Sequence, residues 1–157
     1  MSLKILQELF STLNPNKITP YITEGNWSAH TLIPFILDYT GDANVWISSF
    51  SICEDSVRVL VTDSRIKKLY CLLDASILRY KRDLFFFLES KAEVRICANH
   101  SKVIIVEGHV NRVAVITSAN LTVNRRVESG VIFTDDNFFI IKDQFLDRFN
   151  SMAYGIG

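Results

Sequence analysis

The chain has 157 residues, of which 48% are hydrophobic and 22% are charged. This composition is that of an ordinary globular protein, and it excludes a chain that is disordered over most of its length. The length predicts one domain, 1–157, with a substantial core.

The 17 basic and 17 acidic side chains cancel, but the basic ones are concentrated in the middle of the chain. Residues 65–126 carry twelve bases and five acids, against three and seven in residues 1–64 and two and five in residues 127–157. A polyanion such as nucleic acid needs only a local basic surface, so the middle segment is compatible with a nucleic-acid partner. A basic but solvated face without a ligand is an equally good interpretation.

The first elements are predicted from the spacing of apolar residues and from turn formers. Residues 1–13 favour an amphipathic helix, without the apolar stretch of a signal peptide or of a membrane span. The Pro-, Asn- and Gly-rich segment 14–26 is typical of a loop. Helices are expected over 32–39 and 54–68, with a strand over 44–50 between them.

The second half alternates strands and helices and contains a hairpin. Strands are expected over 70–76, 93–98, 103–106, 113–116 and 128–134, and helices over 80–90 and 136–152. Gly108 and Asn111 supply the turn between the two hairpin strands. The pattern predicts an α/β fold with a single mixed sheet between helices. Residues 1–25 are a helix-and-loop lead-in, and residues 26–157 are the core.

The three cysteines, Cys53, Cys71 and Cys97, lack the spacing of a zinc site or of a disulfide framework. A thiol inside an apolar strand usually behaves as a small hydrophobic side chain. We therefore expect a protein of the reducing cytoplasm, with no metal, no cofactor and no membrane partner.

Polar side chains flank the apolar strands between residues 99 and 130. His100 and Lys102 are two residues apart at one strand start, so they leave the same face of the sheet. Ser118 and Asn120 repeat this spacing after the next strand, and Glu128 opens a third. All five can meet at the carboxyl edge of the sheet, where open α/β sheets bind their ligands.

Plainer interpretations exist for each of these residues. A single His100 is more often an ordinary strand-edge histidine, and Ser118 and Asn120 are common turn formers. Arg125 and Arg126 are more often solvated loop residues than phosphate ligands. The combination of five such groups is what favours a site.

The combination resembles the signature of the phospholipase D superfamily, which is H-x-K, four residues and an Asp, and then G-S-x-N with a downstream Glu. "HSK" matches the first element and "TSAN" the second, with Thr117 in place of Gly. Glu107 stands where the family has Asp, and the interval to "TSAN" is longer than in the family.

The resemblance implies a phospholipase D-like fold and a metal-independent phosphodiesterase that acts through a phosphohistidine, with nucleic acid as the expected substrate. His100, Lys102, Ser118, Asn120 and Glu128 take the catalytic positions. Thr117, Arg125 and Arg126 are expected to bind substrate. Two His-Lys pairs are needed and the chain has one, so a homodimer is expected. The alternative is a catalytically silent, dimeric binding or assembly module of a phage or mobile element.

Overall fold

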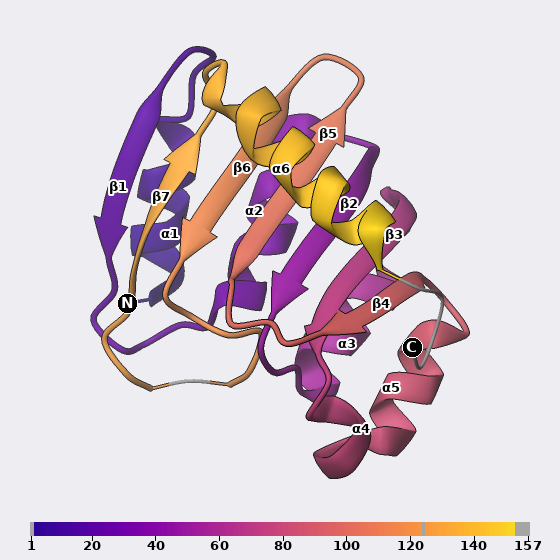
Figure 1. Ribbon diagram of the computed structural model, residues 1–157. Helices are drawn as coiled ribbons and strands as arrows, with labels where there is room; N and C mark the ends of the chain where they lie inside the picture. The colour runs from indigo at the N-terminus through magenta and orange to yellow at the C-terminus, as the bar shows by residue number, and fades with distance from the viewer. Residues whose placement is uncertain (1, 124, 153–157) are drawn as a thin grey trace.

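A seven-stranded mixed sheet forms the centre of the computed structural model, which describes residues 2–123 and 125–152 (Figure 1). The strands are β1 (Ile18–Ile22), β2 (Ala43–Ser49), β3 (Ile66–Asp74), β4 (Glu93–Cys97), β5 (Val103–Gly108), β6 (Arg112–Thr117) and β7 (Ser129–Phe133). Their order in the sheet is β1-β7-β6-β5-β2-β3-β4. β2, β3 and β4 are parallel, and all other neighbouring strands are antiparallel. The predicted mixed sheet is confirmed.

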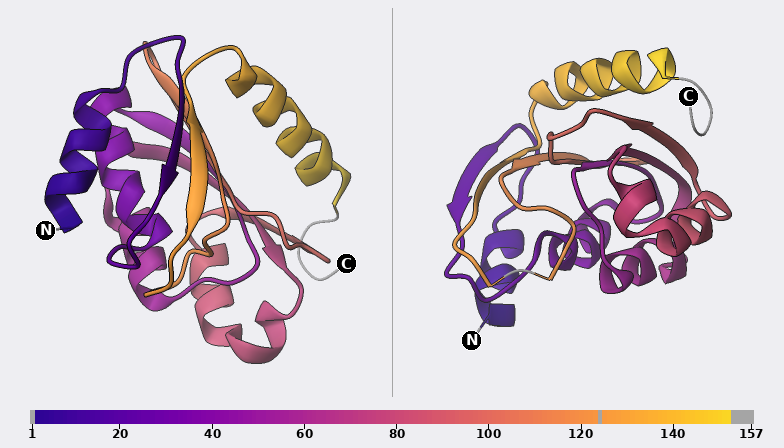
Figure 2. Two further views of the ribbon diagram at one scale, coloured as in Figure 1. Left: turned by 90° about the vertical axis from the view of Figure 1, so that its left-hand side faces the viewer. Right: turned by 60° about the horizontal axis from the view of Figure 1, so that its bottom comes forward.

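Helices cover both faces of the sheet, as predicted, but unequally. They are α1 (Ser2–Ser11), the 3₁₀ helix η1 (Ala29–Thr31), α2 (Leu32–Thr40), α3 (Glu54–Thr62), α4 (Ile77–Tyr80), α5 (Arg82–Glu89) and α6 (Asn137–Ser151). The core on one face includes side chains of α1, α2, α3 and α5. Of the described helices, α6 lies over the other face (Figure 2). The core there is formed by Phe138, Phe145 and Phe149 of this helix together with side chains of the sheet. No described helix is long and apolar enough to cross a membrane.

The central strands are apolar on both sides because each side chain alternates between these two cores. In β2, Val45 and Ile47 belong to the larger core, whereas Trp46 lies under α6. In β5, Ile104 belongs to the larger core and Ile105 lies under α6, and both are almost fully buried. Strands buried on both faces explain why the sequence shows short continuous apolar runs instead of polar alternation.

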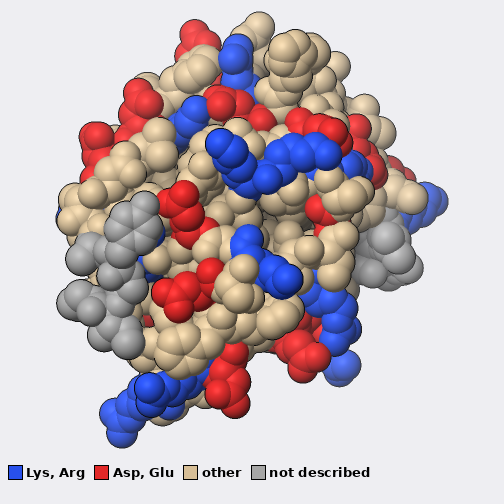
Figure 3. All heavy atoms as spheres, turned by 90° about the vertical axis from the view of Figure 1, so that its right-hand side faces the viewer, with Lys and Arg blue, Asp and Glu red and all other residues tan. Residues whose placement is uncertain are grey.

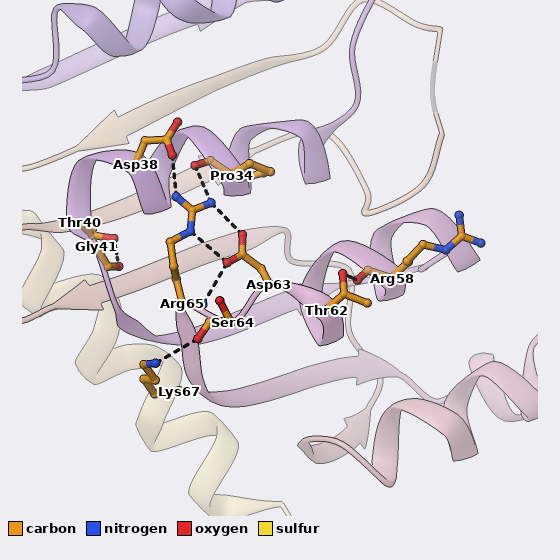
Figure 4. Close-up of polar contacts among 10 residues, drawn as sticks. All are labelled: Pro34, Asp38, Thr40, Gly41, Arg58, Thr62, Asp63, Ser64, Arg65 and Lys67. Carbon is orange, nitrogen blue, oxygen red and sulfur yellow. Dashed lines mark hydrogen bonds and ion pairs between the residues drawn. The ribbon is translucent and has the colours of Figure 1, made fainter.

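The helix expected over 54–68 ends earlier, at Thr62, and this correction has a local cause. The Asp63 carboxylate accepts a hydrogen bond from the backbone N of Arg65 at 3.0 Å. Arg65 also donates to Asp63 Oδ2 at 2.8 Å and to Asp38 Oδ1 of α2 at 2.6 Å (Figure 4). Hydrogen bonds from Arg65 lower the pKa of Asp63. This turn redirects the chain, so that residues 66–68 start β3.

The segment expected to be a loop, 14–26, contains the edge strand β1. β1 pairs antiparallel with β7, with Pro20 opposite Val131. An edge strand tolerates proline because one side of its backbone needs no hydrogen bond from the sheet. The lead-in therefore contributes a strand to the sheet, whereas a division of the chain near residue 25 stays a prediction. The helix expected over 80–90 is also modified, because α4 and α5 meet at Lys81.

Candidate active site

All seven strands have one end at the edge of the sheet where the predicted catalytic residues lie. β1, β2, β3, β4 and β6 end at this edge, and β5 and β7 begin there. Ser48 near the end of β2 is opposite Val103 at the start of β5, and Thr117 at the end of β6 is opposite Gly130. The short segments that leave these strands therefore lie at a common edge.

His100 and Lys102 lie in the segment 98–102 between β4 and β5. The Lys102 ammonium donates to the backbone O of His100 at 2.7 Å, and its Nζ is 3.3 Å from His100 Nδ1. His100 is exposed, and its ring centroid is 5.3 Å from that of Phe50, which follows β2. The structure thus places the predicted cation and the predicted imidazole in direct contact.

The buried side chain of Asn99 anchors the segment that carries His100. Its amide nitrogen donates to Ser48 Oγ at 3.0 Å and to the carbonyls of Ser49 and Leu72 at 3.3 and 3.1 Å. Its oxygen accepts from the backbone N of Ser101 at 3.1 Å and from Ser101 Oγ at 2.7 Å. Asn99 therefore joins β2, β3 and the segment around His100 through one side chain.

Asp74, the last residue of β3, holds the same segment by its backbone. Its carboxylate accepts hydrogen bonds from the backbone N of Asn99 and of Ser76, each at 2.9 Å. Burial acts to raise the pKa of Asp74, but the hydrogen bonds from Ser76 and Asn99 and the nearby His100 outweigh it. The pKa of Asp74 is therefore lowered, and a carboxylate is present beside His100 at neutral pH.

Ser118 and Glu128 face each other across the ends of β6 and β7. The Ser118 hydroxyl donates to Glu128 Oε2 and accepts from the backbone N of Ser129 at 3.0 Å. The backbone of Glu128 is held by Thr23, whose hydroxyl accepts from the Glu128 N at 2.9 Å. Burial raises the pKa of the Tyr21 phenol, a hydrogen bond with Thr117 opposes the shift, and the Glu128 carboxylate adds to it. Residues at and just after the end of β1 therefore help to position Glu128.

The Asn120 side chain has a buried oxygen, Oδ1, that lacks a hydrogen-bond partner within residues 2–123 and 125–152. A buried polar atom without a partner is rare in native proteins and calls for an explanation. This unsatisfied atom makes Asn120 a candidate for contact with a ligand.

The three residues expected to bind substrate differ in their surroundings. Thr117 is buried, and its hydroxyl donates to the Ser129 O at 3.2 Å and accepts from the Ala119 N at 3.1 Å. Arg125 and Arg126 are exposed in the loop between β6 and β7. A Cβ added to Gly25, which has φ +76°, would lie 2.6 Å from the Arg125 O, so only glycine allows this close approach. The roles of Thr117, Arg125 and Arg126 toward a substrate stay predictions.

Glu107 lies at the opposite end of β5 from His100. Its carboxylate binds the Lys142 ammonium of α6 at 2.8 and 3.0 Å, and this ammonium is 4.9 Å from the centre of the Trp46 ring. The residue at the family's Asp position thus attaches α6 to the sheet at the edge remote from the candidate site.

Charge on one side of the molecule is mixed. On the side of the molecule that carries β4 and α5, Lys and Arg side chains alternate with Asp and Glu side chains (Figure 3). Across the described residues, no three His, Cys, Asp or Glu side chains are grouped so that they could hold a metal ion. The basic middle of the sequence therefore does not form a uniform basic face on this side.

Sequence reasoning missed Asn99, Asp74, Ser48 and Phe50. Asn99 and Asp74 follow apolar strands, as turn formers usually do, so they carried no particular signal. Only the pairing of β3 with β2 and with β4 shows that these side chains converge next to His100.

Comparison with known proteins identifies the fold. No protein-family model matches the chain, and no curated protein sequence does. Among solved structures, it is similar to Nuc from Salmonella typhimurium, a phospholipase D family member, with TM-score 0.69, 18% identity, and coverage of 90% of this chain and 99% of that one. NucT from Helicobacter pylori gives TM-score 0.65 and 16% identity over 88% of this chain and 100% of that one.

A third similar structure is TrmBL2, an archaeal chromatin protein whose mode of DNA binding has been described. Its TM-score is 0.55 and its identity 15%, over 98% of this chain and 61% of that one. These identities are low, so the similarity establishes architecture. The chain has the fold of the phospholipase D family.

Proposed function

We propose that this protein is a metal-independent phosphodiesterase that cleaves nucleic acid through a phosphohistidine intermediate, at a site shared by two subunits. The observation that supports it is the contact between Lys102 and His100, at the same edge of a phospholipase D fold as Ser118, Asn120 and Glu128. A scaffold without activity has no need for this set of groups at one edge.

The reaction uses the His100 imidazole as nucleophile. An imidazole nitrogen forms a bond to phosphorus while the bond from phosphorus to the leaving oxygen breaks. A second, protonated imidazole donates its proton to that oxygen. Water then attacks the phosphohistidine, the second imidazole takes the proton of the water, and the phosphorus–nitrogen bond breaks. Both histidines return to their initial states.

The remaining groups stabilise charge. The Lys102 ammonium and the amide nitrogen of Asn120 are suited to hold the non-bridging oxygens, on which negative charge develops. The Ser118 hydroxyl joins them once its proton turns from Glu128 toward the substrate. Glu128, which accepts the hydrogen bond of Ser118, holds this hydroxyl in place. Its carboxylate is also suited to orient an imidazole, by analogy with the carboxylate of a serine-protease triad.

We infer that the second imidazole comes from a second subunit. The chain has three histidines. His109 follows β5 in the turn to β6, at the edge remote from His100, and His30 lies in η1 between β1 and α2. An isologous dimer brings a residue near the two-fold axis close to its own copy.

A face that a second subunit can cover adjoins the site. α6 covers the sheet only in part, and Ile116 of β6 and Ile22 of β1, on the same side of the sheet as α6, are 44% and 76% exposed. Large apolar side chains grouped on a sheet surface are typical of an interface. Burying them in a two-fold contact would place two His100 side chains near the axis.

The test is a plasmid-nicking assay in excess chelator. Wild type should nick the plasmid, and His100→Ala should reduce the rate by at least about 10²-fold while the thermal transition stays in place. Light scattering should give a dimer at micromolar concentration. Activity that requires added magnesium and survives His100→Ala would overturn the proposal.

A second candidate is a binding or assembly module that has no catalytic activity. The similarity to TrmBL2 favours it, because that DNA-binding chromatin protein has the same fold. This alternative predicts that the protein shifts the mobility of DNA in chelator without nicking it. In that case His100→Ala should leave both the binding and the DNA unchanged.

A further inference from the structure

A pocket opens beside His100, on the side of the sheet that faces α6. Its volume is about 390 Å³, and its walls are the segment 98–101 and one side of α6. Its lining includes Leu72 of β3, which is only 3% exposed, so the pocket reaches the sheet between the strands and the helix. Because His100 is itself part of the wall, a group in this pocket lies next to the residue whose imidazole would attack phosphorus.

The lining fits a flat, heteroaromatic group. Leu72 and Phe145 offer apolar contact to the faces of a ring, and Gln144 and Arg148 of α6 supply an amide and a guanidinium. In the part of the chain that the structure describes, neither of these two side chains makes a hydrogen bond or an ion pair. Ligand pockets of this kind combine apolar walls with a few polar groups that fix orientation.

The position of the pocket between the sheet and α6 limits what can enter. A base in a duplex is stacked on both sides, so it has to leave the stack before it can fill a pocket between a strand and a helix. A single strand can present such a base at little cost. Phe50, 37% exposed and in ring contact with His100, offers a surface on which a neighbouring base can stack.

We propose that the pocket beside His100 binds one unstacked base, and that the site therefore selects single-stranded nucleic acid. This inference rests on the proposed function for the position of the phosphate, but the binding of the base can be measured without turnover. A second copy of the chain, whose side chains could fill the same pocket, is the competing occupant.

The experiment measures equilibrium binding by fluorescence anisotropy at one fixed salt concentration. The probes are a labelled twelve-nucleotide DNA single strand and the duplex of the same sequence. Every protein carries His100→Ala, which stops turnover. Ala98→Phe fills the pocket from its exposed wall. Ala75→Phe makes the same change at an exposed residue after β3 that does not line the pocket.

The parent protein should bind the single strand at least about tenfold more tightly than the duplex, since stacking of one base is worth roughly that factor or more. Ala98→Phe should remove most of this preference and leave duplex binding unchanged, and Ala75→Phe should retain it. Gln144→Leu, which keeps the helix and removes the amide, should weaken single-strand binding in the same direction. If the Ala98→Phe variant does not fold, Gln144→Leu serves as the test of the pocket in its place.

Equal affinities for strand and duplex would overturn the inference. So would an Ala98→Phe variant that changes the sedimentation of the protein from dimer to monomer without changing the strand preference, because the pocket would then belong to the subunit interface. A protein that binds the single strand as expected but never nicks DNA would refute the proposed function and leave this inference standing.

Discussion

Asn99→Ala is expected to destabilise the fold and to displace His100 at the same time. The change deletes five contacts of the amide group: its two protons are shared among Ser48, Ser49 and Leu72, and its oxygen accepts two hydrogen bonds from Ser101. Each protein hydrogen bond contributes about 0.5–1.5 kcal/mol net, and buried groups left unpaired cost more. Because the weakest of the five is 3.3 Å long and water can reach the exposed Ser101, we expect a total loss of about 2–4 kcal/mol in the free energy of unfolding.

Urea denaturation with a thermal scan measures this loss. For a domain of this size about 3 °C of melting temperature corresponds to each kcal/mol, so the midpoint should fall by about 6–12 °C. Asn150→Ala, at an exposed position on α6, is the matched control and should change stability by less than about 0.5 kcal/mol. Turnover of Asn99→Ala should also fall under conditions in which the variant is fully folded. Equal stabilities of the two variants would refute the role of Asn99 as an anchor.

Three further predictions concern charged residues. Asp74→Asn should destabilise the protein at pH 7. Because the pKa of Asp74 is lowered, the difference in the free energy of unfolding between wild type and variant should shrink as the pH falls below about 4. Urea titrations that give the same difference at pH 3 and pH 7 would contradict this. Glu128→Gln should reduce turnover by roughly 10³-fold in chelator while the free energy of unfolding changes by less than about 0.5 kcal/mol. Unchanged turnover would show that Glu128 has only a structural role. Lys142→Met leaves the Glu107 carboxylate, 30% exposed, without its partner. The free energy of unfolding, measured by urea denaturation, should fall by about 1–2 kcal/mol, and turnover should stay intact. Lost turnover in the folded variant would show that Glu107 acts on the site.

The sequence predicts the sheet and most of its elements because the local signals are strong. The apolar runs around Ile105 and Val115 are β-branched and bounded by turn formers, and they form the predicted hairpin. Ile66 shows where this reasoning fails. It fits the helical spacing of the preceding residues, yet the turn at Asp63, stabilised by Arg65, assigns it to a strand.

The site was predictable to the extent that its residues are close in sequence. His100 and Lys102 are two positions apart, and their contact follows from this spacing. Asn99 and Asp74 could not be found in the same way. Their hydrogen bond joins residues 25 positions apart, and that pairing exists only after the parallel strands have assembled.

The pairing of β1 with β7 has a consequence for the order in which the protein becomes functional. The hydrogen bond from the Glu128 N to Thr23 spans 105 positions of the chain. Contacts of such long range form slowly, since a large loop has to close first. On the ribosome β1 emerges before β7, and this strand waits for its partner until residues 129–133 have also been made. We therefore expect the Ser118–Glu128 half of the site to be completed last, so that a nascent chain carries an exposed His100 before it has a complete site.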